Sequence, residues 1–175
     1  MTTRLIVIAA AVLIAWGVKR QYAGAAVEDL WWILRPTTGL VSVMTGERFT
    51  WQAGEGYMSR NRLFVVEKTC AGINFMIAAF GMLVVAFSHR ARPGRSAFGV
   101  LGGSLLAGYS AAVMINALRI AIAMWLAAHP GSFPAFTAAD IHRLEGIIVY
   151  FGGLVLLHEV ARQFDRRVFA PGRTS

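Results

Sequence analysis

The chain has 175 residues, the length of one ordinary domain, but its composition excludes an ordinary soluble domain. Apolar residues (AVILMFWYC) make up 57% of it and charged residues only 15%, against about 25% charged in typical soluble domains. The net charge of +8 would suit a nucleic-acid binder, but the basic residues flank apolar runs and no basic helix with interleaved aromatics occurs, so we expect no nucleic-acid partner.

Four segments contain almost no charge, and Arg119 is the only charged side chain within them. A soluble protein of this size has no interior large enough to bury all four. We therefore predict an all-α integral membrane protein with about four transmembrane helices, an interfacial segment and a short polar outer hairpin. The prediction is a single multi-pass domain over 1–175, with spans at 5–23, 70–88, 97–126 and 141–163 and an outer interfacial and polar segment at 27–69.

The first apolar segment, 5–18, is followed by Lys19 and Arg20. With the residues up to Ala23 it is long enough for a tilted transmembrane helix. A cleavable signal peptide is the alternative, because Ala23-Gly24-Ala25 resembles a cleavage site. The two basic residues before that site argue against cleavage, and on either interpretation the chain continues on the outer face.

The next segment, 27–46, has paired tryptophans followed by Arg35 and Pro36. The charge and the proline make a full span unfavourable, whereas tryptophan beside arginine is typical of the membrane interface. Residues 47–69 alternate aromatic and aliphatic side chains around Gly54 and Gly56, which favours a short exposed hairpin.

Charge in the short loops predicts the orientation of the other helices. The loop 88–96 holds three arginines and no acid, so we place it inside the cell, whereas 129–139 has no Lys or Arg and belongs outside. The last helix is expected to begin near Ala138, since Thr137 and Asp140 have the spacing of a helix start. The opposing evidence is the basic content of 19–69, but long exported segments translocate largely regardless of charge.

Small residues recur every four positions along 97–126 in two stripes. Such stripes let helices approach closely in lipid. We favour packing within the chain, with a seam in a homo-oligomer or with a partner protein as the alternative. The stripes are Gly99, Gly103, Ala107 and Ala111, and Ser104, Gly108, Ala112 and Asn116.

Three chemically active side chains are predicted at one membrane depth. Arg119 lies 22 residues beyond Ala97, about 33 Å along a helix, and the hydrocarbon is about 30 Å thick, so Arg119 reaches the outer interface. Cys70 begins the second span and His142 lies in the opening turns of the last helix, both at the same face. A thiol becomes a nucleophilic thiolate near a cation, an imidazole shuttles protons, and a guanidinium, here held by Asn116, can stabilise an oxyanion. The three groups together favour acyl transfer.

Each of these residues also has a structural interpretation. A cysteine at a helix start is often a small buried residue, Arg119 can extend to the headgroups, and His142 can pair with Glu145. A single cysteine excludes an internal disulfide and CxxC motifs, and we expect neither a metal site nor a cofactor.

Three motifs resemble those of the exosortase/archaeosortase family, and the small size of the chain is similar to the short exosortase K branch. The motifs occur in the family's order and spacing. They are Glu67-Lys68-Thr69-Cys70-Ala71-Gly72-Ile73, Asn116-Ala117-Leu118-Arg119 and His142-Arg143-Leu144-Glu145-Gly146.

The resemblance implies a membrane-embedded cysteine protease or transpeptidase of the bacterial inner membrane, with its active site at the periplasmic face. Its partner would be an exported protein, whose C-terminal sorting signal is cut through a thioester. Cys70 would be the nucleophile, His142 the acid and base, and Arg119 the oxyanion stabiliser, supported by Gly72, Asn116 and Gly146. The alternatives are a non-catalytic membrane scaffold or assembly factor and a membrane acyltransferase that uses Cys70.

Overall fold

The computed structural model describes residues 2–129 and 138–169, and the side chains of residues 138, 139, 142, 168 and 169 lie outside this description. The described residues are mostly helical and form one small sheet. Its elements are α1 (Thr2–Gly24), η1 (Glu28–Leu30), α2 (Trp31–Thr45), β1 (Phe49–Gln52), β2 (Gly56–Ser59), β3 (Val65–Val66), η2 (Lys68–Cys70), α3 (Ile73–Phe87), η3 (Ser88–Arg90), α4 (Arg95–Ala128) and α5 (Ala138–Phe169).

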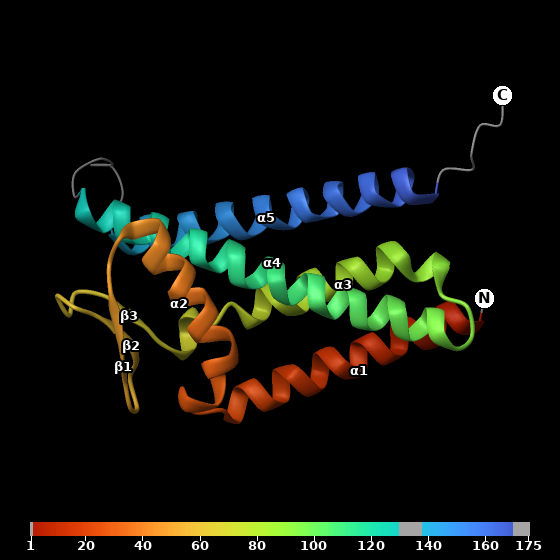
Figure 1. The fold of residues 1–175 in the computed structure, drawn as a ribbon, viewed down its shortest axis with the longest axis horizontal. Coiled ribbons are helices and arrows are strands. Elements are labelled where there is room, and N and C mark those ends of the chain that lie inside the picture. The colour runs from red at the N-terminus through yellow and green to blue at the C-terminus, as the bar shows by residue number, and fades with distance from the viewer. Residues whose placement is uncertain (1, 130–137, 170–175) are drawn as a thin grey trace.

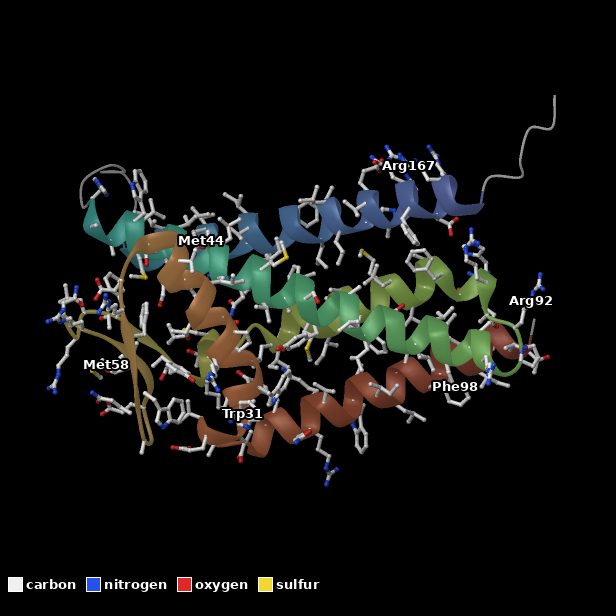
Figure 2. The ribbon with its side chains drawn as sticks, in the orientation of Figure 1. Trp31, Met44, Met58, Arg92, Phe98 and Arg167 are labelled. Atoms are coloured by element: carbon white, nitrogen blue, oxygen red, sulfur yellow. The ribbon has the colours of Figure 1, made fainter. Side chains whose placement is uncertain are left out.

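Within the described residues, four helical segments are long and apolar enough to cross a membrane, which confirms the prediction of four such helices. They run side by side along the long axis of the molecule, while α2 and the sheet gather at one end (Figure 1). We call that end the sheet end, and the opposite end, where residues 88–95 connect α3 to α4, the loop end. Large apolar side chains lie exposed on the outside of the helices, as the labelled Phe98 shows (Figure 2).

Helices α3 and α4 form the centre of the bundle: each contacts the other and both α1 and α5, and α4 also contacts α2. The stripe that contains Gly108 and Asn116 is buried on α4. A Cβ atom at Gly108 would lie 3.0 Å from the backbone nitrogen of Phe80, so only glycine lets α4 approach α3 this closely. This stripe therefore serves packing within the chain, the interpretation that the sequence favoured.

Helix α2 continues through Pro36, the residue that with Arg35 makes a full membrane span unfavourable for this segment. Proline lacks the N–H that would bond the carbonyl of Trp32 four residues earlier. The phenol of Tyr109 on α4 donates a hydrogen bond of 2.8 Å to that carbonyl, and its ring stacks on the Trp32 ring. The bond from a distant helix satisfies the carbonyl that Pro36 leaves unpaired, so the helix tolerates the proline.

Tyr109→Phe should lower the free energy of unfolding by about 1–3 kcal/mol, because the Trp32 carbonyl then loses its donor. Pro36→Ala restores a backbone N–H to the same carbonyl. The double variant should therefore lose less stability than the sum of the two single variants. Unfolding in mixed detergent micelles measures all three; additive losses would contradict this account.

The predicted hairpin is present, and a third strand extends it. β1 pairs antiparallel with β2, and the two-residue β3 pairs with β2 on its other edge. A Cβ atom at Gly56 would lie 2.5 Å from the carbonyl oxygen of Val66, so a glycine is required at this position for β3 to lie beside β2. The third strand leads the chain back onto the bundle and into η2, which ends at Cys70.

Candidate functional site

Cys70 ends η2 and lies half-buried at the sheet end of the bundle. The turn before it is fastened to α1, because the Lys68 ammonium donates to the carbonyl of Ala23 at 3.2 Å and the Tyr22 hydroxyl donates to the Lys68 carbonyl at 3.1 Å. The Thr69 hydroxyl lies 3.9 Å from the Cys70 sulfur. These contacts fix the backbone on which the thiol is mounted.

Asn116 of α4 is 0% exposed, and its side chain joins α4 to η2 and to α5. Its Nδ2 donates a hydrogen bond to the carbonyl oxygen of Cys70, and its Oδ1 accepts one of 2.8 Å from the Tyr150 hydroxyl of α5. Gly72 makes the first bond feasible. Its backbone has a φ of 68°, in the left-handed region, and a Cβ atom there would lie 3.0 Å from the Asn116 side chain.

Gly72→Ala should lower the free energy of unfolding by about 2–4 kcal/mol. The left-handed backbone alone costs an alanine about 1–2 kcal/mol, and displacement of Asn116 adds the loss of a buried hydrogen bond. Gly46→Ala is the matched control, because Gly46 has a φ of 74° with nothing within 4 Å of a Cβ atom. Equal losses for the two variants in an unfolding titration would show that the contact with Asn116 contributes nothing.

Arg119 lies one turn after Asn116 and faces α5. Its Nε is 3.7 Å from Glu145 Oε2, with the two side chains 14% and 4% exposed, and its guanidinium carbon lies 5.3 Å from the centre of the Tyr150 ring. A Cβ atom at Gly146 would come within 3.1 Å of Arg119 Nε, so this glycine leaves room for the guanidinium. The cation is thus held between a carboxylate and an aromatic face.

The expectation that Asn116 holds Arg119 is wrong. The Asn116 carboxamide is bonded to Cys70 and Tyr150, whereas Glu145 and Tyr150 contact the guanidinium. The two side chains lie three positions apart on one helix and share Tyr150, but Asn116 otherwise bonds Cys70 and Arg119 otherwise contacts Glu145. The link from Cys70 to Arg119 therefore runs through Tyr150.

His142 lies in the second turn of α5, and its side chain falls outside the described residues, so its predicted contacts stay a prediction. The backbone still gives its position. Residues 142 and 146 are four apart, so they occupy the same face of the helix, and Gly146 is the residue against which Arg119 packs. The Thr137 helix start also lies outside the described residues.

Two residues of this cluster were not predicted as parts of it. Tyr150 contacts Asn116 and Arg119, and Glu145 is the carboxylate beside Arg119. One signal in the sequence points to Glu145, since a buried arginine in an apolar helix requires a counter-charge at matching depth. Nothing comparable marks Tyr150. We define the site cluster as Cys70, Asn116, Arg119, Glu145 and Tyr150.

The arrangement joins a half-buried thiol, a shielded guanidinium and a phenol at one end of a helical bundle. Comparison of the chain with protein families, with curated proteins and with solved structures found no match. Any assignment of function therefore depends on the residues themselves.

Proposed function

We propose that the chain is a multi-pass protein of the bacterial inner membrane that acts as a cysteine transpeptidase or protease of exosortase type. It would cut the C-terminal sorting signal of an exported protein. The observation that carries the proposal is the site cluster. In it Asn116 bonds the backbone of Cys70, which has the only thiol of the sequence, and Tyr150 links Asn116 to Arg119. Arg119 is the only charged side chain of α4 between Ser96 and Ala128.

The membrane location is supported by the surface of the bundle. Four helices have the length and composition of membrane spans, and large apolar side chains cover their outward faces. A water-soluble protein rarely exposes so much contiguous apolar surface. The arginines of the loop end favour the cytoplasmic side for that end, which would place the site cluster at the periplasmic face.

The chemistry would proceed through a thioester. Cys70 gives its thiol proton to His142, and the thiolate attacks the carbonyl carbon of the scissile peptide. The carbonyl oxygen becomes an oxyanion that the Arg119 guanidinium stabilises. Collapse of this intermediate breaks the C–N bond, and the leaving amine takes a proton from His142. An acceptor amine, an acceptor hydroxyl or water then attacks the thioester and restores the thiol.

The roles of the supporting residues follow from their contacts. Asn116 fixes the Cys70 backbone through its carbonyl, and Gly72 allows that approach. Gly146 leaves space for Arg119, and Glu145 orients the guanidinium. A fixed donor stabilises developing charge better than a mobile one, because it needs no reorganisation during the reaction.

Co-expression with candidate exported proteins that carry a C-terminal tag tests the proposal. The wild-type chain should release the tag, and Cys70→Ala or His142→Ala should abolish release while the amount of each variant in the membrane stays unchanged. Tag release that persists in Cys70→Ala would refute a nucleophilic thiol.

The same experiment separates the two alternatives. A scaffold would leave the tag in place and the partner bound to the chain in both wild type and Cys70→Ala. A lipid acyltransferase would leave the tag in place and change lipid composition in a Cys70-dependent way. Either result would contradict the proposed protease.

A further inference from the structure

A second feature lies at the loop end, away from the site cluster. It is a cavity of about 960 Å³ between α3, α4 and α5, close to the upper size of known ligand cavities, about 1,000 Å³. Its walls are mainly apolar. They include Phe87, Gly99, Gly103, Ala107, Leu157 and Phe164.

The first small-residue stripe of α4 gives the cavity its depth. Gly99 and Gly103 have nothing within 4 Å of a Cβ atom, whereas Gly108 of the second stripe fits closely against Phe80. One stripe therefore packs helices of this chain together, and the other leaves a gap that the chain does not fill.

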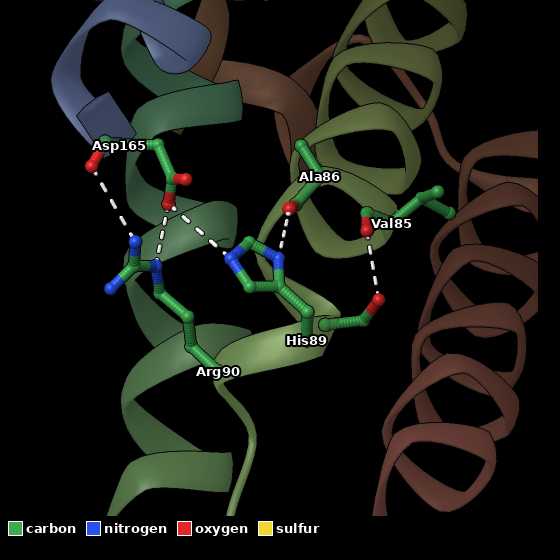
Figure 3. A network of polar contacts seen from close by, with 6 residues as sticks. Val85, Ala86, His89, Arg90 and Asp165 are labelled. Atoms are coloured by element: carbon green, nitrogen blue, oxygen red, sulfur yellow. Dashed lines mark hydrogen bonds and ion pairs between the residues drawn. The ribbon is translucent and has the colours of Figure 1, made fainter. Parts of the chain in front are cut away.

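The cavity carries positive charge where it meets the loop end. The positive charge there comes from Arg90 and Arg92, which line it beside His89, and Asp165 contacts Arg90 and His89. That carboxylate is shared by Arg90 at 2.5 Å and His89 at 3.6 Å (Figure 3). Arg92 lines the cavity and lies exposed at the loop end (Figure 2).

We propose that this cavity binds an anionic phospholipid, with its acyl chains against the first small-residue stripe and its phosphate beside Arg92 and Arg90. Basic pockets between membrane helices are known binding sites for anionic headgroups. A transmembrane helix of a partner fits less well. Lys and Arg concentrate at the cytoplasmic end of such helices, so a partner helix would bring positive charge to a positive opening.

Native mass spectrometry of the purified full-length chain with added phosphatidylglycerol or phosphatidylcholine tests this site. The wild type should bind phosphatidylglycerol at least about tenfold more tightly than phosphatidylcholine. Gly103→Leu should weaken binding of both lipids at least about tenfold by filling the gap. Arg92→Gln should weaken phosphatidylglycerol binding about fivefold, the effect of one basic residue near a headgroup, and leave phosphatidylcholine binding unchanged.

Two matched controls distinguish the cavity from the general lipid belt. Gly102 has the same open surroundings but does not line the cavity, and Arg95 carries the same charge at the same end outside it. Gly102→Leu and Arg95→Gln should bind both lipids within about twofold of the wild type. Equal losses in these controls, or equal wild-type affinity for the two lipids, would overturn the proposal.

A protein helix in the cavity, from a partner or a second copy of the chain, would give a different result. If Gly103→Leu abolishes self-association or capture of a partner helix while lipid binding stays unchanged, the cavity is a protein interface and the proposal is wrong. Thermal unfolding checks that Gly103→Leu folds. If it does not fold, Arg92→Gln, which alters no packed side chain, decides the question.

Discussion

Arg119→Met is expected to lower the free energy of unfolding by about 3–5 kcal/mol, the usual cost of removing one partner of a buried ion pair. Methionine fills much of the arginine volume, so loss of packing contributes little. The loss arises because the carboxylate of Glu145, 4% exposed, no longer has the guanidinium beside it. Unfolding titrations of the purified chain measure the effect.

A second substitution separates the structural role of Arg119 from its proposed catalytic role. In Arg119→Met/Glu145→Gln both charges are gone, and the stability should return to within about 1–2 kcal/mol of the wild type, since a neutral pair removes the buried charge. Processing of a tagged substrate should stay abolished, because no cation is left to stabilise an oxyanion. A double variant that regains both stability and processing would show that Arg119 is only structural.

Cys70→Ala should reduce substrate processing roughly a thousandfold or more, the scale expected when a nucleophile is removed. It should change the free energy of unfolding by less than about 1 kcal/mol, because the side-chain polar contact of the thiol in the described structure is the weak one to Thr69, at 3.9 Å. The bond from Asn116 goes to the backbone carbonyl of residue 70, which alanine retains. Tag release and unfolding, measured on the same preparation, test both halves.

Thr69→Ala is the matched control for that variant. It removes the neighbouring hydroxyl, which bonds the exposed Glu67 carboxylate at 2.6 Å, and leaves the thiol in place. Processing should persist at more than about a third of the wild-type rate. A loss as large as that of Cys70→Ala would mean that the turn, rather than the sulfur, is what the activity requires.

The long helices were predictable because each is a continuous apolar run. The continuous helix through Pro36 could not be predicted from the sequence, for a physical reason. Whether a helix tolerates an internal proline depends on what satisfies the orphaned carbonyl, and here the donor is Tyr109, 77 residues from Trp32 along the chain. β3 was missed because two residues carry no periodicity, and its pairing depends on Gly56 allowing Val66 to approach.

The candidate site was also predictable only in part. Counting the helical rise placed Arg119 and Cys70 at one depth, and the described contacts connect them through Asn116 and Tyr150. Depth says nothing about helix rotation, however. The rotation decides that Asn116 turns toward Cys70 while Arg119 turns toward Glu145, and only the packed bundle contains that information.

Mass spectrometry of the chain after co-expression with a processed substrate tests the central claim most directly. The account predicts a covalent adduct on Cys70 with the mass of the substrate's upstream fragment, released by hydroxylamine as a thioester should be and absent from Cys70→Ala. Substrate that is cleaved at the wild-type rate in Cys70→Ala cells, with no adduct on the wild-type chain, would contradict it.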